Sequence, residues 1–293
     1  MIGFVLSGGA NLGSVHVGML TALLEAGVKP DIIVGTSIGS VNAAYLAADP
    51  SLEHLESLQK LWCDVRAREI FPLNPAANAR ALFREGALFS SKGWRRFLEQ
   101  RMPYRTFDET TVPLRITATD YEEGQSTVFD SGPVIDAMLA STALPGIFPP
   151  YRVGERWFID GAISEQLPLK VALEAGADTI YVMAVSVPSP PDRRSPLAIL
   201  RHSVTILLYP RIRLDALDLP GEAPSVRIIQ VPSVKTEVSL WDMSRHDELI
   251  RNSYKVTKEF LEAENDNDEP VDVATVPQME IETQVPEEPA VEG

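Results

Sequence analysis

The chain of 293 residues is poor in the residue types that mark several protein classes. Its single cysteine, Cys63, excludes an internal disulfide, and the helical pattern around it predicts a plain core residue. The four histidines, His16, His54, His202 and His246, form no cluster with metal-ligand spacing, so we expect no bound metal and no cofactor. The first residues lack the basic start of a secretory signal peptide. We therefore expect a cytoplasmic protein that touches membranes only briefly.

Positive charge is also scarce, because the net charge is −15 and no Lys or Arg follows Lys258. Residues 262–293 carry eleven carboxylates and no aromatic side chain, and without them the net charge is only −4. A segment of this composition cannot bury enough apolar surface to fold. We expect residues 264–293 to be a disordered acidic tail on a folded domain of residues 1–263. The acidic balance argues against a nucleic-acid partner.

No apolar run is long enough to cross a bilayer. The nearest candidate, residues 197–214, combines Ile, Leu and Val with three arginines. Its pattern fits a core helix with a basic end, and it also fits an interfacial helix that meets anionic lipid.

Apolar strand patterns and helical patterns alternate along the rest of the chain. Strands are expected at residues 2–6, 31–34, 114–119, 126–129, 156–159, 179–185 and 226–231. Helices are expected at residues 13–26, 39–48, 52–66, 133–140, 168–175 and 243–263. This order predicts an α/β fold, a three-layer α/β/α sandwich around a mainly parallel central sheet. Residues 67–112, which contain three prolines, are expected to form an irregular insertion that shapes a pocket or lid.

Residues 35–39, with the sequence GTSIG, match the Gly-x-Ser-x-Gly pattern of a nucleophile elbow. A strand pattern enters this motif and a helical pattern leaves it. In such a turn the hydroxyl of Ser37 stands at the apex, and Gly35 and Gly39 allow the tight backbone path. The helix N-terminus behind the serine favours negative charge that forms there. The alternative is a glycine-lined turn in which Ser37 only caps the helix.

Residues 7–13, with the sequence SGGANLG, form a glycine-rich loop between the first strand and the first helix. Gly8, Gly9 and Gly13 lack the dinucleotide-binding spacing, and no Gly-Lys-Ser/Thr follows, so a Walker loop is excluded. The loop can offer backbone N–H groups to the oxyanion of acyl transfer, each worth about 3–4 kcal/mol. The alternative is a close helix–strand crossing that needs small residues.

Asp160 follows an apolar strand pattern and precedes Gly161, so its carboxylate can reach a site while the chain turns away. An Asp-Gly hairpin turn is the competing interpretation.

Together, these three motifs resemble the bacterial branch of the patatin-like phospholipase family. They follow the family's order and approximate spacing, and residues 140–150, ASTALPGIFPP, are similar to the segment before its catalytic aspartate. The resemblance implies a patatin-like fold and a serine acyl hydrolase that cleaves lipid esters as a phospholipase A, lysophospholipase or esterase. It implies Ser37 as nucleophile and Asp160 as its partner in a Ser–Asp dyad. Gly8, Gly9 and Ala10 match the family's oxyanion hole.

The sequence departs from the family's pattern at three positions. Ala10 replaces a glycine, and we expect it to be tolerated with a negative φ. Leu12 replaces an Arg or Lys, which either removes a cation that favours anionic substrates or places an apolar side chain in the core. Gln166 stands where the family commonly has Asn.

Three functions remain open at this point. The first is hydrolysis, the second is acyl transfer from the same acyl-enzyme to another acceptor, and the third is lipid binding without catalysis. No histidine occupies a recognisable triad position, and His16 is expected to pack near the site. The resulting mechanism asks Asp160 to take the proton of Ser37 directly or through water.

Overall fold

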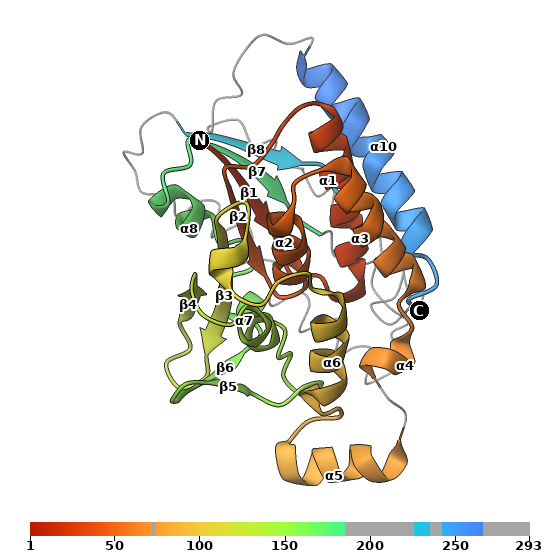
Figure 1. Ribbon diagram of the computed structural model, residues 1–293, viewed down its shortest axis with the longest axis vertical. Helices are drawn as coiled ribbons and strands as arrows, with labels where there is room; N and C mark the ends of the chain where they lie inside the picture. The colour runs from red at the N-terminus through yellow and green to blue at the C-terminus, as the bar shows by residue number, and fades with distance from the viewer. Residues whose placement is uncertain (72–73, 186–225, 235–241, 266–293) are drawn as a thin grey trace, which may run out of the picture.

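The central sheet has the spatial order β5-β6-β3-β2-β1-β7-β8, with β4 paired to β3 (Figure 1). This computed structural model describes residues 1–71, 74–185, 226–234 and 242–265. Five strands, β1, β2, β3, β7 and β8, run parallel, and β4 and β6 pair antiparallel with β3. The mainly parallel sheet is therefore confirmed. The strands are β1 (Ile2–Leu6), β2 (Ile32–Thr36), β3 (Leu114–Asp120), β4 (Ser126–Phe129), β5 (Tyr151–Val153), β6 (Arg156–Ile159), β7 (Thr179–Met183) and β8 (Arg227–Val231).

Helices cover both faces of the sheet. Because side chains alternate along a strand, Phe4 and Leu6 face one layer and Val5 faces the other. Helices α1, α2, α3, α7 and α10 pack on the first face, and α8 packs on the second. The helices are α1 (Ser14–Glu25), α2 (Ile38–Ala48), α3 (Leu52–Asp64), α4 (Ala67–Ile70), α5 (Pro75–Glu85), α6 (Ser91–Arg101), α7 (Val134–Ser141), α8 (Leu169–Glu174) and α10 (His246–Asn265).

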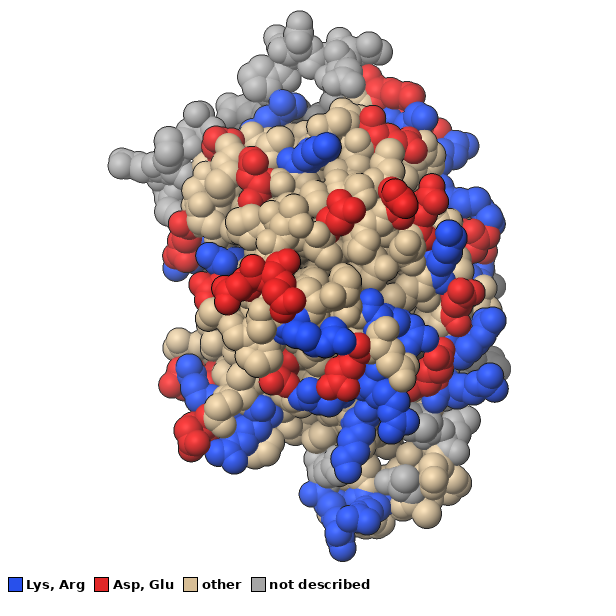
Figure 2. All heavy atoms as spheres, viewed as in Figure 1, with Lys and Arg blue, Asp and Glu red and all other residues tan. Residues whose placement is uncertain are grey.

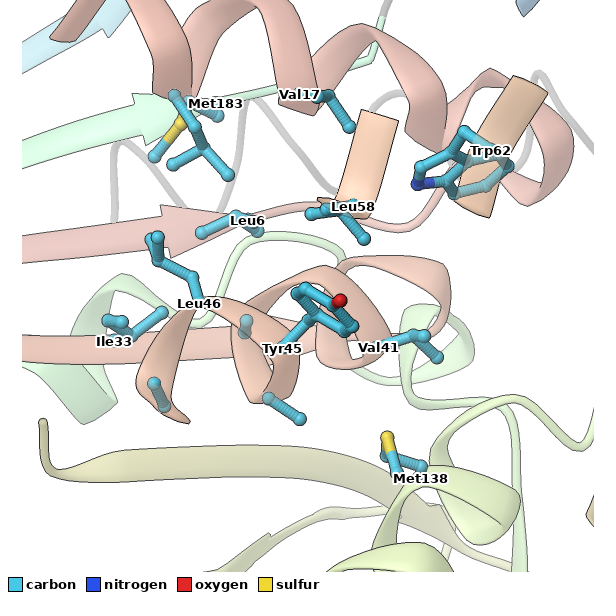
Figure 3. Packing of buried hydrophobic residues seen from close by; sticks show 14 of the residues in the cluster. Leu6, Val17, Ile33, Val41, Tyr45, Leu46, Leu58, Trp62, Met138 and Met183 are labelled. Carbon is cyan, nitrogen blue, oxygen red and sulfur yellow. The ribbon is translucent and has the colours of Figure 1, made fainter. Parts of the chain in front are cut away.

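The main core lies between the sheet and the larger helical layer. Figure 3 shows Leu6 of β1 and Ile33 of β2 close to Leu46 of α2, with Leu58 of α3 next to Leu6 and Trp62 farther along α3. The parallel strands end at one edge of the sheet, and the loops at that edge carry the motifs that the sequence singles out. Cys63 lies half-buried at the margin of this core, so it is less enclosed than expected.

The expectation of an irregular insertion at residues 67–112 is wrong. The segment contains α4, α5, α6 and a 3-10 helix, η2 (Phe107–Glu109). Two of the prolines mark helix ends, since Pro75 begins α5 and Pro103 comes directly after Met102, the C-cap of α6. Pro72 lies outside the described residues. Trp94 of α6 is buried and donates a hydrogen bond to Thr142 Oγ1 at 2.8 Å.

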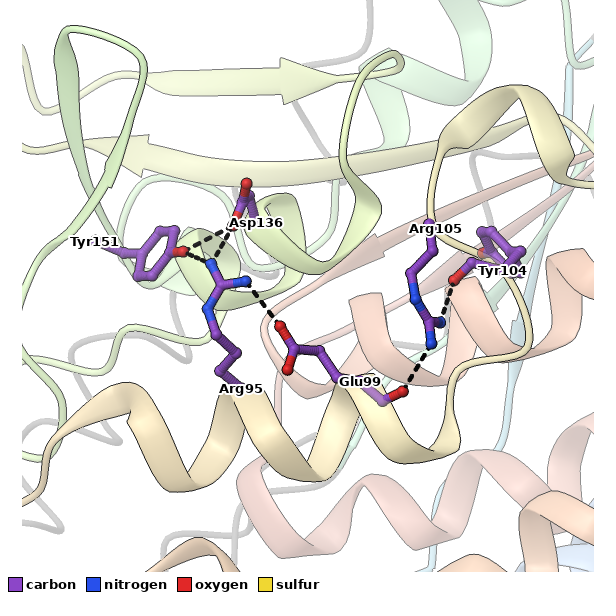
Figure 4. Close-up of polar contacts among 6 residues, drawn as sticks. All are labelled: Arg95, Glu99, Tyr104, Arg105, Asp136 and Tyr151. Atoms are coloured by element: carbon purple, nitrogen blue, oxygen red, sulfur yellow. Dashed lines mark hydrogen bonds and ion pairs between the residues drawn. The ribbon is translucent and has the colours of Figure 1, made fainter.

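Polar contacts fasten α6 to the neighbouring elements. Figure 4 shows Arg95 of α6 between Glu99, Asp136 of α7 and Tyr151 of β5. Arg105 donates to the backbone carbonyls of Glu99 and Tyr104, so it closes the end of α6.

Two other differences concern short or distant elements. The strand β5, which pairs with β6 in a hairpin, was not expected because three residues carry almost no pattern. Residues 186–225 and 266–293, which contain the candidate interfacial helix and nearly all of the acidic tail, lie outside the described residues. Among the helices that the structure describes, none combines the length and apolar character needed to span a membrane.

Candidate active site

The strand, turn and helix that the sequence predicts around Ser37 are present. Ser37 stands between β2 and α2 with φ 50° and ψ −129°, a conformation that costs a non-glycine residue about 1–3 kcal/mol. The carbonyl oxygen of Ser37 accepts two hydrogen bonds from Ser40, one from its backbone N–H at 2.9 Å and one from the Ser40 hydroxyl at 2.6 Å. These bonds hold the strained turn, so the hydroxyl of Ser37 has a fixed direction.

The sheet brings Ser37 and Asp160 together although 123 positions separate them in the chain. The hydroxyl of Ser37 donates a hydrogen bond of 2.7 Å to Asp160 Oδ2. Strand β6 ends at Ile159 and pairs with β3, which in turn pairs with β2. Asp160 is held there by its N–H, which donates to Ala143 O, and by its carbonyl, which accepts from Thr119 Oγ1.

The Asp160 carboxyl is enclosed, with 3% of the residue exposed. Its Oδ1 accepts the backbone N–H of Ala162 at 2.9 Å, and among the described residues no Lys or Arg forms an ion pair with it. Burial raises the pKa of this carboxyl to about 6, against the opposing effect of the hydrogen bonds from Ser37 and Ala162. A carboxyl with this pKa is ionised at neutral pH and is a stronger base than an exposed aspartate.

The glycine loop lies directly beside the serine. A Cβ placed on Gly8 would lie 3.1 Å from Ser37 Cβ, so only a glycine allows this approach without displacement. The carbonyl of Gly8 accepts hydrogen bonds from Gln166 Nε2 and Ser7 Oγ. Because C=O and N–H point in opposite directions across a trans peptide, these bonds also fix the N–H of Gly9. In the described part of the chain, the N–H groups of Gly8, Gly9 and Ala10 donate no hydrogen bond.

The other glycines of the three motifs are required by close contacts and not by a positive φ. A Cβ at each would lie between 2.4 and 2.8 Å from its nearest neighbour. These positions and neighbours are Gly9 (Val185), Gly13 (Ile38), Gly35 (Gly39 O), Gly39 (Leu6 O) and Gly161 (Thr117 O).

Ser141, which the sequence did not single out, anchors the elbow from behind. Its Oγ accepts the backbone N–H of Ser37 at 2.8 Å and donates to Thr117 O at 2.6 Å. Ser141 is the last residue of α7 and is fully buried. The N–H of Ser37 is therefore occupied, whereas no described residue accepts the N–H groups of residues 8–10 in the glycine loop.

A family model described as patatin-like phospholipase matches residues 4–173, more than half of the chain. The chain belongs to the patatin-like phospholipase family. The match contains the glycine loop, the elbow and Asp160, which the structure brings together in one place.

Two curated relatives show how this family member compares with longer proteins. It is 30% identical over 198 residues to Lysophospholipase NTE1 of Scheffersomyces stipitis, a match that covers 66% of this chain and 12% of that protein. It is 30% identical over 182 residues to an uncharacterized NTE family protein of Mycobacterium bovis, a match that covers 62% of this chain and 47% of that protein. The matched segment thus spans less than half the length of either relative.

One solved structure supports the fold assignment. Human GIVD cytosolic phospholipase A2, in complex with a methyl gamma-linolenyl fluorophosphonate inhibitor and terbium chloride, aligns with a TM-score of 0.51. The alignment covers 90% of this chain and 58% of that chain at 11% sequence identity.

The described histidines make packing contacts away from Ser37 and Asp160, as expected for a site whose base is not a histidine. His16 is fully buried, its Nδ1 lies 3.2 Å from Asn42 Nδ2, and burial lowers its pKa to about 4. His246 Nδ1 contacts Trp62 O, and His54 stacks on Tyr45. Among the described residues, no histidine forms a hydrogen bond with Ser37 or Asp160, and no three potential ligands form a metal site. His202 lies outside the described residues.

In this patatin-like loop, the structure contradicts the expectation for Ala10 and decides between the two alternatives for Leu12. Ala10 has φ 50°, not the negative φ expected, so an alanine occupies a left-handed conformation that favours glycine. Leu12 is completely buried in the main core, so the apolar alternative is correct at this position. A cation at position 12 would have no water around it in this arrangement.

We expect Ala10→Gly to stabilise the protein by about 0.5–1 kcal/mol, because glycine adopts a positive φ without steric cost. The matched control is Ala26→Gly, since Ala26 is exposed and has φ −74°. That change should destabilise by about 0.5–1 kcal/mol through greater freedom of the unfolded chain. Urea unfolding measures both, and a loss of stability in both variants would contradict the strain at Ala10.

Proposed function

We propose that this protein is a serine acyl hydrolase that cleaves ester bonds of lipids through an acyl-enzyme. The observation that carries the proposal is the 2.7 Å hydrogen bond from the Ser37 hydroxyl to Asp160, at a strained elbow beside backbone N–H groups that no described residue accepts. Family membership supports a lipid ester as the substrate class.

In the proposed first step, Asp160 Oδ2 takes the proton of Ser37 while Oγ attacks the carbonyl carbon of the ester. The carbonyl oxygen becomes an oxyanion, which the N–H groups of Gly8, Gly9 and Ala10 stabilise. Collapse of this intermediate breaks the bond to the leaving alcohol, which receives the proton from Asp160. The acyl group is then bound to Ser37 as an ester.

In the second step, water replaces the alcohol. Asp160 removes a proton from the water as its oxygen attacks the acyl carbon, and the same N–H groups stabilise the second oxyanion. The acyl group leaves as a carboxylic acid when the bond to Ser37 Oγ breaks and the serine regains its proton. The reaction needs no group other than the chain's own residues and water.

Labelling with a fluorophosphonate probe tests the proposal, because the probe bonds covalently to an activated serine. The wild type should be labelled and should hydrolyse short p-nitrophenyl esters, whereas Ser37→Ala should do neither. Ser131→Ala, which changes an exposed serine outside the site, is the matched control and should behave as the wild type. An unlabelled wild type with the ester activity of Ser37→Ala would exclude the proposal.

The ester-cleavage assay, repeated with added acyl acceptors, distinguishes hydrolysis from acyl transfer. Added alcohols or lysolipids compete with water for the acyl group on Ser37. If the product is mainly the transferred ester, the protein is an acyltransferase with the same nucleophile.

A further inference from the structure

Helix α5 presents an apolar face to solvent. Phe83 is 87% exposed, and Leu82 and Leu88 are 49% and 45% exposed, so three large apolar side chains lie open within seven residues. Leu88 lies three residues after the end of α5. Single exposed apolar residues are ordinary, but a cluster within one short segment marks an interaction surface. Figure 1 shows α5 projecting from the lower end of the molecule, away from the sheet.

The spacing of residues gives α5 two distinct sides. Ala76 and Ala79 are exposed and lie on the same side as Phe83, because they precede it by seven and four positions. Ala81, which is buried, lies about 160° around the helix from Phe83. The helix is therefore attached through one side and presents the opposite, apolar side outward.

Arginines flank this apolar side in a chain that is otherwise acidic. Arg80 and Arg84, four positions apart, are both exposed beside Phe83. Residues 66–101 contain eight Lys and Arg and three Glu, whereas the whole chain has 26 basic and 41 acidic residues. Figure 2 shows Lys and Arg gathered at the lower end of the molecule, over α5 and α6.

Several of these cations form no ion pair within the part of the chain that the structure describes. Arg95 and Arg101 are engaged in ion pairs within the body of the protein (Figure 4 shows the first). In contrast, Arg80 and Arg84 form no ion pair with any residue that the structure describes, and neither do Lys92 and Arg96 on α6. An apolar strip flanked by free arginines is complementary to a bilayer with anionic headgroups.

The base of α5 is joined to the candidate active site. Leu88 N–H donates to Gly146 O at 2.9 Å, and Phe89 N–H donates to Ile147 O at 3.0 Å. Ala143, three positions before Gly146 in the same segment, accepts the N–H of Asp160 with its carbonyl oxygen. Three residues of chain span at most about 11 Å, so the exposed face begins close to the reacting groups.

We propose that α5 and the residues that follow it to Leu88 form a docking face that seats the protein on a bilayer containing anionic phospholipids. Leu82, Phe83 and Leu88 enter the boundary between headgroups and acyl chains, while Arg80 and Arg84 bind the headgroup phosphates. The use of this face to deliver substrate to Ser37 rests on the proposed function, whereas the docking itself does not.

Co-sedimentation with vesicles of ether-linked lipids tests the docking, because such lipids contain no ester that the protein can cleave. Vesicles of phosphatidylcholine alone are compared with vesicles that also contain phosphatidylglycerol. The full-length wild type should bind the anionic vesicles and be released by high salt. Arg80→Gln/Arg84→Gln and Leu82→Ser/Phe83→Ser should each lower the apparent affinity about tenfold or more.

Matched controls carry the same kinds of change elsewhere on the surface. Lys170→Gln/Lys255→Gln removes two exposed charges, and Tyr121→Ser removes an aromatic residue that is 58% exposed. Both should bind as the wild type does, and all variants should keep the wild-type melting temperature and rate on a soluble short-chain ester. Activity on that ester reports the proposed function separately from vesicle binding.

Equal binding by the wild type and the α5 variants, or an equal loss in the controls, would overturn the proposal. Sedimentation velocity provides the other contrary outcome. If the wild type is a dimer that ignores vesicles, and Leu82→Ser/Phe83→Ser is a monomer, the face joins two copies of the chain.

Discussion

We expect Asp160→Asn to lower kcat on soluble esters by on the order of 10³ while making the folded protein more stable at neutral pH. Activity falls because the amide cannot accept the proton of Ser37. Stability rises because the amide needs no ionisation in an enclosed site, and it can still accept the N–H of Ala162. A gain in stability with a loss of activity is the signature of a functional carboxylate placed in an unfavourable environment.

The gain in stability should depend on pH in a defined direction. The carboxyl has a pKa of about 6 in the folded protein, and an unperturbed aspartate has a pKa of about 3.9. At a pH of about 3 or lower the carboxyl is largely protonated in both states, so the variant and the wild type should be about equally stable. As the pH rises from 4 to 6, ionisation increasingly disfavours the folded wild type, and the difference should reach roughly 2–3 kcal/mol above pH 6.

Urea unfolding across this pH range measures the difference, and the wild-type kcat/KM should rise through pH of about 6 as Asp160 ionises. Asp108→Asn is the control, since Asp108 is exposed and its replacement should change stability by less than about 0.5 kcal/mol. Activity of Asp160→Asn within tenfold of the wild type would remove this residue from the mechanism. A histidine variant as inactive as Asp160→Asn, with normal melting, would favour a triad.

We expect Leu12→Arg to destabilise the protein by several kcal/mol, a large share of the roughly 5–15 kcal/mol that holds a domain folded. Leu12 is 0% exposed, so the change removes apolar burial of about 2 kcal/mol and places a guanidinium in the core without a partner. The variant should melt far below the wild type or fail to fold, and thermal melting and urea unfolding measure this directly.

Two controls separate charge burial from loss of leucine. Leu12→Met keeps the volume and should cost less than about 1.5 kcal/mol. Leu52→Arg makes the same change at a residue that is 42% exposed and should cost less than about 0.5 kcal/mol. A Leu12→Arg variant with wild-type melting would mean that residue 12 turns outward, and its preference between anionic and neutral lipids would then be worth measuring.

The principal motifs could be predicted from the sequence because each combines a local pattern with its flanks. Strand, turn and helix patterns around Ser37 specify the elbow without knowledge of the rest of the fold. The strand pattern before Asp160 and the glycine after it also fitted a hairpin turn, and only the resemblance to the patatin-like family implied its pairing with Ser37. The structure places its carboxylate against Ser37. The alternation of strands and helices likewise gave the layered sheet.

The features that sequence reasoning missed depend on distant contacts. Ser141 lies in the recognised segment 140–150, but its role carries no local signal, since its partners are Ser37 and Thr117, 104 and 24 positions away. The positive φ of Ala10 contradicts the intrinsic preference of alanine, and it occurs where Gly9 packs against Val185. The helices of the insertion were missed because prolines were interpreted as signs of irregular structure, whereas Pro75 and Pro103 mark helix ends.

The distance along the chain between the two halves of the site has a consequence for synthesis. At a translation rate of about 5–20 residues per second, Asp160 emerges roughly 6–25 seconds after Ser37, which lies 123 positions earlier. The hydrogen bond from Gln166 Nε2 to the carbonyl of Gly8 also forms later, because Gln166 follows Gly8 by 158 positions. In the proposed mechanism, a growing chain on the ribosome therefore holds its nucleophile without a base or an ordered oxyanion loop. Esterase activity would appear only after the strand before Asp160 has joined the sheet. The time at which activity appears therefore reports when this part of the fold is complete.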